Sequence, residues 1–149
     1  MPILLDVTYK KGLGEYTCLF DSLSMIRAHF GEMSFMNPKF DFFKGVKMGQ
    51  LDDVLEAYTP ANKTLCGKLN KFAIAPPKEK YKLAGLEQLL RQCGPLLAIT
   101  PPKDEWGHCC VVIGASAMGV TYHDPALGPN KNVLFHKFSQ KFPILFWFA

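Results

Sequence analysis

The chain has 149 residues, of which 48% are hydrophobic and 13% aromatic, so it is long and apolar enough to bury a core. This composition excludes an intrinsically disordered chain and predicts a single domain over residues 1–149. The formal net charge is +4, but it comes from scattered lysines and only two arginines, Arg27 and Arg91. Because nucleic-acid surfaces favour a continuous, arginine-rich basic stripe, we expect no nucleic-acid partner.

The cysteines and the N-terminal residues limit the cellular setting. Five cysteines cannot all pair within one chain, and their spacings resemble no disulfide framework, so reduced thiols in a cytosolic compartment are expected. The sequence has neither a Cys-x-x-Cys nor a His-x-x-x-His pair, which argues against a zinc site. No apolar run is long enough to cross a bilayer and no signal-peptide pattern opens the chain, so we expect no membrane partner.

The first part of the chain contains one clear helix. Residues 3–9 have the pattern of a short strand or an extended arm, and the glycine-containing residues 10–17 that of a loop. From Cys18 apolar residues recur at helical spacing, and Gly31 follows where the helix is expected to end. These apolar residues are Leu19, Leu23, Ile26 and Phe30. Thr17 precedes the helix and is predicted to be its N-cap.

The middle of the chain gives fewer signals. Residues 35–46 are aromatic and irregular, and residues 61–82 match no regular pattern, since a proline pair interrupts them. Apolar spacing predicts a helix over residues 51–58, and a group of leucines predicts another over residues 83–93.

After Gly94 the pattern changes to strands. Five segments with the composition of strands are separated by turn residues, and they cover residues 96–100, 108–114, 119–123, 132–135 and 144–148. The second segment has almost no polar side chain, so we expect it at the centre of a sheet and covered on both faces. Helices followed by strands predict an α+β domain in which the first helix packs on the later sheet.

Three residues in this pattern have the chemistry of a nucleophilic site. Cys18 is expected at the N-terminus of a helix, where the partial positive charge of the helix stabilises a thiolate. His108 opens the apolar strand and Asp124 follows the next strand, so their side chains can meet across the sheet. His108 would then act as the base beside the thiolate, while Asp124 fixes the tautomer and orientation of the imidazole.

Four short motifs resemble those of papain-like cysteine proteases. They are YTCLF at 16–20, GPL at 94–96, WGH at 106–108 before the apolar strand, and YHDP at 122–125. The resemblance covers residues 3–30 and 83–140 and is strongest to a small bacterial branch, related to bacteriocin-processing (C39-like) peptidases and secreted effector proteases. It implies a papain-like α+β fold whose N-terminal helix carries the nucleophile Cys18 and packs on a C-terminal antiparallel sheet. It also implies His108 as the base and Asp124 as the orienting acid, with no metal or organic cofactor.

Two positions depart from the family pattern. The family has a glutamine six residues before the nucleophile, whose side-chain amide helps to bind the oxyanion, and Gly12 occupies that position here. Because one such donor is worth roughly two to three powers of ten in rate, either another donor serves or activity is reduced. The backbone N–H of Cys18 can supply one half of the oxyanion hole. Leu19 stands where the family tends to have tryptophan, a change that affects packing more than chemistry.

The resemblance implies a thiol endopeptidase that cleaves a protein substrate, with small residues before the scissile bond. It further implies an effector toxin that leaves its cell without a signal peptide and cleaves a protein in the cytoplasm of a competing or host cell. A cognate immunity protein is the implied inhibitory partner. Two other functions stay open. One is a glutamine deamidase or transglutaminase that uses the same three residues, and the other is a non-catalytic binding module, which the missing glutamine favours.

Several residues have competing interpretations. His123 is the alternative base, although strand alternation points it to the opposite side from its neighbour Asp124. Asp124 itself can be read as the start of an Asp-Pro turn. Glu15 and Trp106 are candidates for contact with the substrate. The remaining cysteines, interpreted as structural, are Cys66, Cys93, Cys109 and Cys110.

Overall fold

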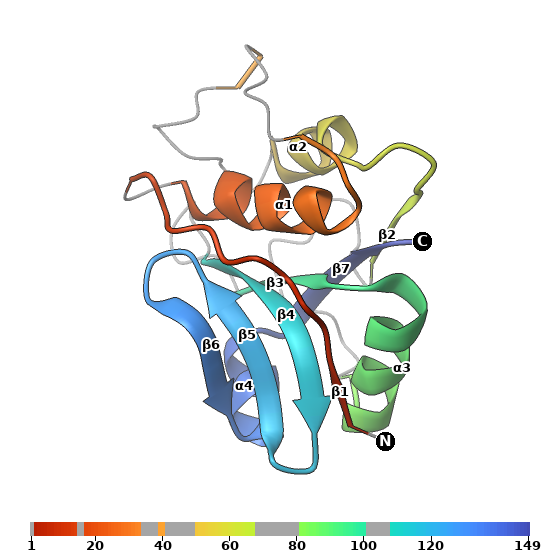
Figure 1. The fold of residues 1–149 in the computed structure, drawn as a ribbon, viewed down its shortest axis with the longest axis vertical. Helices are drawn as coiled ribbons and strands as arrows, with labels where there is room; N and C mark the ends of the chain where they lie inside the picture. Colours follow the sequence, from red (N-terminus) through yellow and green to blue (C-terminus); the bar gives the residue numbers. More distant parts are fainter. Residues whose placement is uncertain (1, 15–16, 34–38, 41–49, 68–80, 101–107) are drawn as a thin grey trace.

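The computed structural model describes residues 2–14, 17–33, 39–40, 50–67, 81–100 and 108–149. The elements are β1 (Ile3–Leu4), α1 (Cys18–His29), α2 (Leu51–Ala57), β2 (Leu65–Gly67), α3 (Leu83–Cys93), β3 (Leu96–Ile99), β4 (Cys109–Ser116), β5 (Gly119–Asp124), β6 (Gly128–Val133), α4 (Phe135–Lys141) and β7 (Ile144–Phe148). The strands form one antiparallel sheet in the order β2-β7-β3-β4-β5-β6, and β1 pairs with β4 beside this path. Helices α1 and α2 cover one face, while α3 and α4 pack against the other (Figure 1).

Strand β4 lies inside the sheet and is apolar on both faces. Cys109 and Val111 belong to the core beneath α1 and α2, whereas Cys110 and Val112 belong to the core beneath α3 and α4. Successive side chains of a strand point to opposite faces, so burial of both faces requires a nearly continuous apolar run. The prediction of a central strand covered on both sides is therefore confirmed, as is the α+β fold class, in which the helix that begins at Cys18 packs on an antiparallel sheet.

Helix α1 begins at Cys18, as predicted, and packs on the sheet through buried apolar side chains such as Leu23. Thr17 occupies the N-cap position, but its side chain makes no hydrogen bond to an N–H of the helix. Its hydroxyl instead lies 2.6 Å from a carboxylate oxygen of Asp21 and 3.0 Å from the backbone nitrogen of Gly14. Asp21 is fully buried and also accepts the N–H of Leu13 at 3.3 Å. The side chains of the first helical turn therefore hold the loop that leads to Cys18.

Two C-terminal elements and one short strand differ from the sequence prediction. The strand predicted over residues 132–135 exists but has other bounds, because β6 spans Gly128–Val133 and α4 begins at Phe135. Strand β6 is polar, so it has no apolar alternation that could mark it. Strand β2 was not predicted either, since three residues are too few to show a period, and it is defined by its pairing with β7. None of the described helices is long and apolar enough to span a bilayer.

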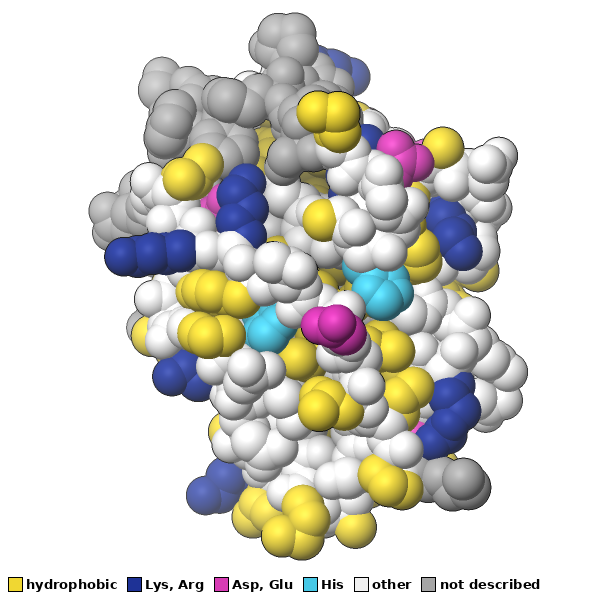
Figure 2. Space-filling model, viewed as in Figure 1, with side chains coloured by type: hydrophobic (Ala, Val, Ile, Leu, Met, Phe, Trp, Pro, Cys, Tyr) yellow, Lys and Arg dark blue, Asp and Glu magenta, His cyan; other side chains and the backbone are white. Residues whose placement is uncertain are grey.

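Charge on the surface is dispersed. On the face drawn in Figure 2, the lysine and arginine side chains are spread around the outline of the molecule, with hydrophobic side chains between them. The large hydrophobic side chains exposed among the described residues are Leu4, Leu13, Met33, Met118, Leu127 and Leu134. This face carries no continuous basic stripe across the residues that the structure describes.

The turn between β4 and β5 is expected to require glycine. Gly119 has φ = +135°, and a Cβ there would collide with the carbonyl oxygen of Val133. Gly119→Ala should therefore lower the free energy of unfolding by about 2 kcal/mol or more. The control is Gly85→Ala in α3, where no atom lies within 4 Å of a Cβ position. That variant should raise the free energy of unfolding by about 0.5 kcal/mol. Urea unfolding followed by circular dichroism measures both, and equal effects would contradict the steric argument.

Candidate active site

Cys18 is the first residue of α1 and lies half-buried at the edge of the core between this helix and the sheet. The N-terminal end of a helix carries a partial positive charge, which favours the thiolate form of a cysteine there. The helix therefore both places the sulfur and contributes to its ionisation.

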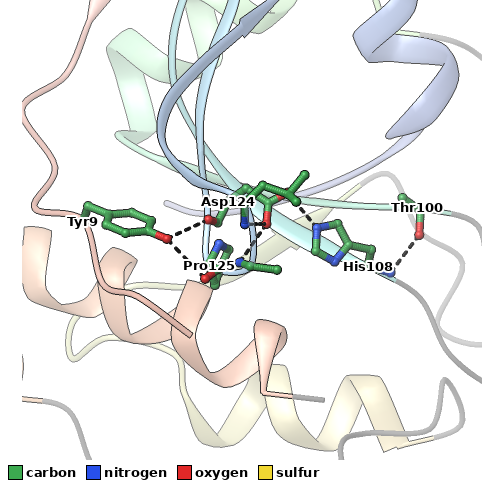
Figure 3. A network of polar contacts seen from close by, with 7 residues as sticks. Tyr9, Thr100, His108, Asp124 and Pro125 are labelled. Atoms are coloured by element: carbon green, nitrogen blue, oxygen red, sulfur yellow. Dashed lines mark hydrogen bonds and ion pairs between the residues drawn. The ribbon is translucent and has the colours of Figure 1, made fainter. Parts of the chain in front are cut away.

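His108 lies directly before β4 and is held by its own backbone. Its N–H donates to the Thr100 hydroxyl at 2.7 Å, and its carbonyl oxygen accepts the Thr100 N–H at 2.9 Å (Figure 3). These two bonds continue the ladder between β3 and β4 beyond its last paired residues, Ile99 and Cys109. The imidazole is thus carried by a rigid backbone, while 31% of its side chain remains exposed.

Asp124 ends β5 and meets His108 from the neighbouring strand, as predicted. Its Oδ2 lies 2.7 Å from Nε2 of His108 (Figure 3). Its other oxygen, Oδ1, accepts the backbone N–H groups of Ala126 and Leu127 at 2.9 and 3.2 Å. The carboxylate is fully buried. Because Asp124 occupies Nε2 of the imidazole, Nδ1 is the nitrogen that remains for Cys18.

The charges at the site favour a thiolate beside an imidazolium. The pKa of Cys18 falls to about 5, because the thiol of Cys109 donates a hydrogen bond and His108 adds a hydrogen bond and charge, against the opposing effect of burial. The pKa of His108 rises to about 9, mainly through the hydrogen bond to Asp124 and then the one to Cys18. Burial alone would raise the pKa of Asp124, but the hydrogen bond and charge of His108 lower it overall.

Cys109 is a neighbour of Cys18 that the sequence interpretation missed. It was interpreted as strand core, and it is buried, but its thiol also bonds to Cys18 and this contact raises its own pKa well above the usual value. Cys109 therefore remains a neutral donor beside the thiolate. Strand alternation was the available signal, because a residue that directly follows His108 on a doubly covered strand can face α1.

His123 has no ring nitrogen left for Cys18. Its Nε2 donates to the Val7 carbonyl at 2.6 Å, and its Nδ1 accepts the N–H of Asn130 at 3.1 Å. A carbonyl can only accept and an N–H can only donate, so this buried ring is held as the neutral tautomer. The structure favours His108 over His123 as the base.

Gly12 lies against the Asp-Pro turn. Its N–H donates to the Pro125 carbonyl at 2.8 Å, and a Cβ at this position would lie 3.0 Å from the same oxygen. A side chain here would press on the turn that carries Asp124, so the close approach of the two backbones explains the glycine.

The remaining sequence candidates do not enter this cluster. Cys66 lies in β2, where its thiol donates to the Thr64 carbonyl at 3.6 Å, and Cys93 ends α3. Cys110 points into the core on the other face of the sheet. Glu15 and Trp106 lie outside the described residues. Within the described ranges, no group of three or more His, Cys, Asp or Glu side chains is arranged to hold a metal ion.

Solved structures share this fold over almost the whole chain. A crystal structure described as a C39-like peptidase from Bacillus anthracis matches with a TM-score of 0.69 and 19% identity, covering 100% of this chain and 98% of that one. A double glycine motif protease from an AMS/PCAT transporter, solved in complex with the leader peptide, matches with a TM-score of 0.59 and 17% identity. It covers 99% of this chain and 96% of that one. The fold is thus that of papain-like, C39-like peptidases.

The sequence profile of the family described as "Papain-like cysteine protease AvrRpt2" matches residues 3–143, and the chain belongs to this family. No curated protein matches the chain by sequence. The resemblance inferred from the four motifs is confirmed, and the protein is a cysteine peptidase that acts on protein substrates.

The profile of kcat/KM against pH should be bell-shaped, with an acid limb set by Cys18 and an alkaline limb set by His108. The thiolate gains a proton below about pH 5 and the imidazolium loses its proton above about pH 9, so kcat/KM should be highest between these values. Stopped assays with a peptide substrate across this range measure the profile. Asp124→Asn removes the main cause of the raised pKa of His108, so it should move the alkaline limb to lower pH. An unchanged alkaline limb in this variant would refute the assignment.

The Cys109 thiol should lower the pKa of Cys18. Cys109→Ala removes the largest stabilising contact of the thiolate, so the pKa of Cys18 should rise toward its ordinary value. The rate of iodoacetamide alkylation of Cys18 against pH, followed by mass spectrometry, measures this change. Cys110→Ala is the matched control, because it deletes the adjacent thiol on the opposite face of β4. A profile for Cys109→Ala that coincides with the control would show that Cys109 has no such effect.

Proposed function

We propose that Cys18, His108 and Asp124 are the catalytic triad of a cysteine endopeptidase. The observation that carries this proposal is the position of His108, whose Nε2 lies 2.7 Å from Asp124 while the neighbouring Cys18 helps to raise the pKa of its imidazole. A nucleophile, a base and a group that orients the base are the three parts that thiol catalysis needs. They come here from α1, the start of β4 and the end of β5.

The reaction proceeds through an acyl-enzyme. The Cys18 thiolate attacks the scissile carbonyl, and the C–N bond breaks as His108 gives its proton to the leaving amine. His108 then takes a proton from water, which attacks the thioester, and the thiolate and the acid product are released with His108 protonated again. Asp124 stays ionised and holds the imidazole through both steps.

The backbone N–H of Cys18 is the proposed first donor of the oxyanion hole. The first N–H groups of a helix have no partner inside the helix, so this N–H can face a developing negative charge. Gly12 has no side chain to replace the family's glutamine, and its own N–H is engaged with Pro125. A reduced rate relative to glutamine-bearing relatives is therefore part of the proposal.

The proposed substrate is a protein in the cytoplasm of a competing or host cell, which makes the peptidase an effector toxin. Family membership supports proteolysis, and the five unpaired cysteines suit a reducing compartment. The neighbour solved with a leader peptide is a double glycine motif protease, which supports small residues before the scissile bond. Delivery without a signal peptide and inhibition by a cognate immunity protein belong to the same proposal.

Removal of either reacting side chain should abolish hydrolysis. Cys18→Ala loses the nucleophile and His108→Ala loses the proton donor and acceptor, so each should lower kcat by at least about a thousandfold. Expression of each variant in a bacterial cytosol, followed by proteome-wide mapping of new N-termini, measures cleavage. Cys66→Ala is the matched control, because it removes a thiol in β2, and it should retain the wild-type cleavage pattern.

The same expressed variants, with mass spectrometry of the intact target proteins added, separate the alternative functions. New N-termini only with active protein support proteolysis. A mass gain of one dalton in an intact target would instead indicate a glutamine deamidase. If Cys18→Ala keeps the full biological effect, the protein acts as a binding module and the catalytic proposal fails.

A further inference from the structure

Asp124 is the last residue of β5, where the pairing with both neighbouring strands becomes irregular. The last pair between β4 and β5 on this side is Val111 with His123, one residue before Asp124. On the other side, Asp124 pairs with Gly128 of β6, but the register shifts between this pair and the pair at Tyr122. Because a register shift bends the strand locally, contacts made by the turn itself help to set the direction of the Asp124 side chain.

Tyr9 contacts this turn from the other end of the chain. Its hydroxyl lies 2.9 Å from the carbonyl oxygen of Asp124 and 3.2 Å from that of Pro125 (Figure 3). We propose that Tyr9 is a positioning residue for the reaction, which holds the Asp-Pro turn so that Asp124 meets His108. The proposal rests on the triad assigned above.

The turn is held from two sides. Inside it, Oδ1 of Asp124 accepts the N–H groups of Ala126 and Leu127, which fixes the carboxylate relative to the turn. Outside it, Tyr9 and the Gly12 N–H bind the turn carbonyls, which fixes the turn relative to the N-terminal arm. A Cβ on residue 12 would lie 3.0 Å from the Pro125 oxygen, so a side chain here would shift the turn or the arm by a few tenths of an ångström.

His123 anchors the arm that carries Tyr9. The rings of Tyr9 and His123 meet edge to face with centroids 5.5 Å apart. His123 also donates to the Val7 carbonyl, two residues before Tyr9. His123 directly precedes Asp124 and Pro125 directly follows it, so the arm contacts the chain on both sides of Asp124. The buried His123 therefore has a structural role.

Loss of the Tyr9 hydroxyl should act on the imidazole through Asp124. The titratable groups that face His108 are Cys18 of α1 and Asp124 of β5, and the hydrogen bond to Asp124 is the larger influence on its pKa. A displaced turn lengthens this bond, so the imidazolium loses its proton at lower pH and the thiolate loses part of its stabilising charge. A residue that only stabilises the fold would leave both titrations where they are.

The test compares Tyr9→Phe with Thr59→Val. Thr59→Val deletes one hydroxyl-to-carbonyl hydrogen bond of 2.8 Å at the end of α2 and serves as the control for lost stability. Peptide hydrolysis by Tyr9→Phe should fall about tenfold in kcat with KM unchanged, which corresponds to about 1.4 kcal/mol. Its alkaline limb should move to lower pH, whereas the control keeps the wild-type profile. Gly12→Ala, which displaces the same turn without touching the hydroxyl, should move the limb in the same direction.

The pH dependence of Cys18 alkylation gives a second measurement that needs no substrate. In Tyr9→Phe the alkylation midpoint should move to higher pH, because the imidazolium beside the thiolate is less stable. A folded Tyr9→Phe whose hydrolysis and alkylation profiles coincide with those of the control would overturn the proposal. If wild-type protein hydrolyses no peptide while the alkylation midpoint still moves, the proposed function fails and the positioning role of Tyr9 stands.

Discussion

The geometry of the site depends on how β4 is fixed within the sheet. A strand that is apolar on both faces can slip by one residue without exposing a polar side chain, so hydrophobicity alone does not set its register. Gly114 provides the missing constraint, because a Cβ there would lie 2.9 Å from the carbonyl oxygen of Ile3. Strand β1 pairs with β4 through Gly114 and its neighbour Ala115. The register that follows places His108 at the start of the strand, next to Thr100 on one side and Asp124 on the other.

Residues of α1, β4 and β5 together stabilise the charged forms of Cys18 and His108. Helix α1 and the thiol of Cys109 stabilise the negative sulfur, and Asp124 stabilises the positive imidazole. Each charge is half-buried or fully buried, so each needs a partner that is already in place. A second buried carboxylate, Asp21, is balanced separately by Lys10 at 3.6 Å and by the Thr17 hydroxyl. The loop before Cys18 and the triad therefore have independent electrostatic support.

Local patterns in the sequence were sufficient for the parts of the site that end regular elements. Cys18 follows from helical spacing, and His108 and Asp124 follow from where two apolar strands begin and end. The polar β6 and the three-residue β2 have no periodicity, so pairing with a neighbouring strand defines them and sequence could not. The contacts of Tyr9 and Gly12 with the Asp-Pro turn were not predicted, for another reason. The importance of these two residues comes from contacts with Asp124 and Pro125, and nothing near them in the chain indicates such partners.

The contact between Tyr9 and Asp124 joins residues that are 115 positions apart in the chain. Contacts of such long separation close large loops, and their entropic cost is met only when most of the domain has condensed. Cys18 is synthesised early, whereas His108 and Asp124 emerge much later from the ribosome. A partly made chain consequently carries an ordinary thiol. The contacts that lower the pKa of Cys18 and raise the pKa of His108 therefore form only after β4 and β5 have joined the sheet.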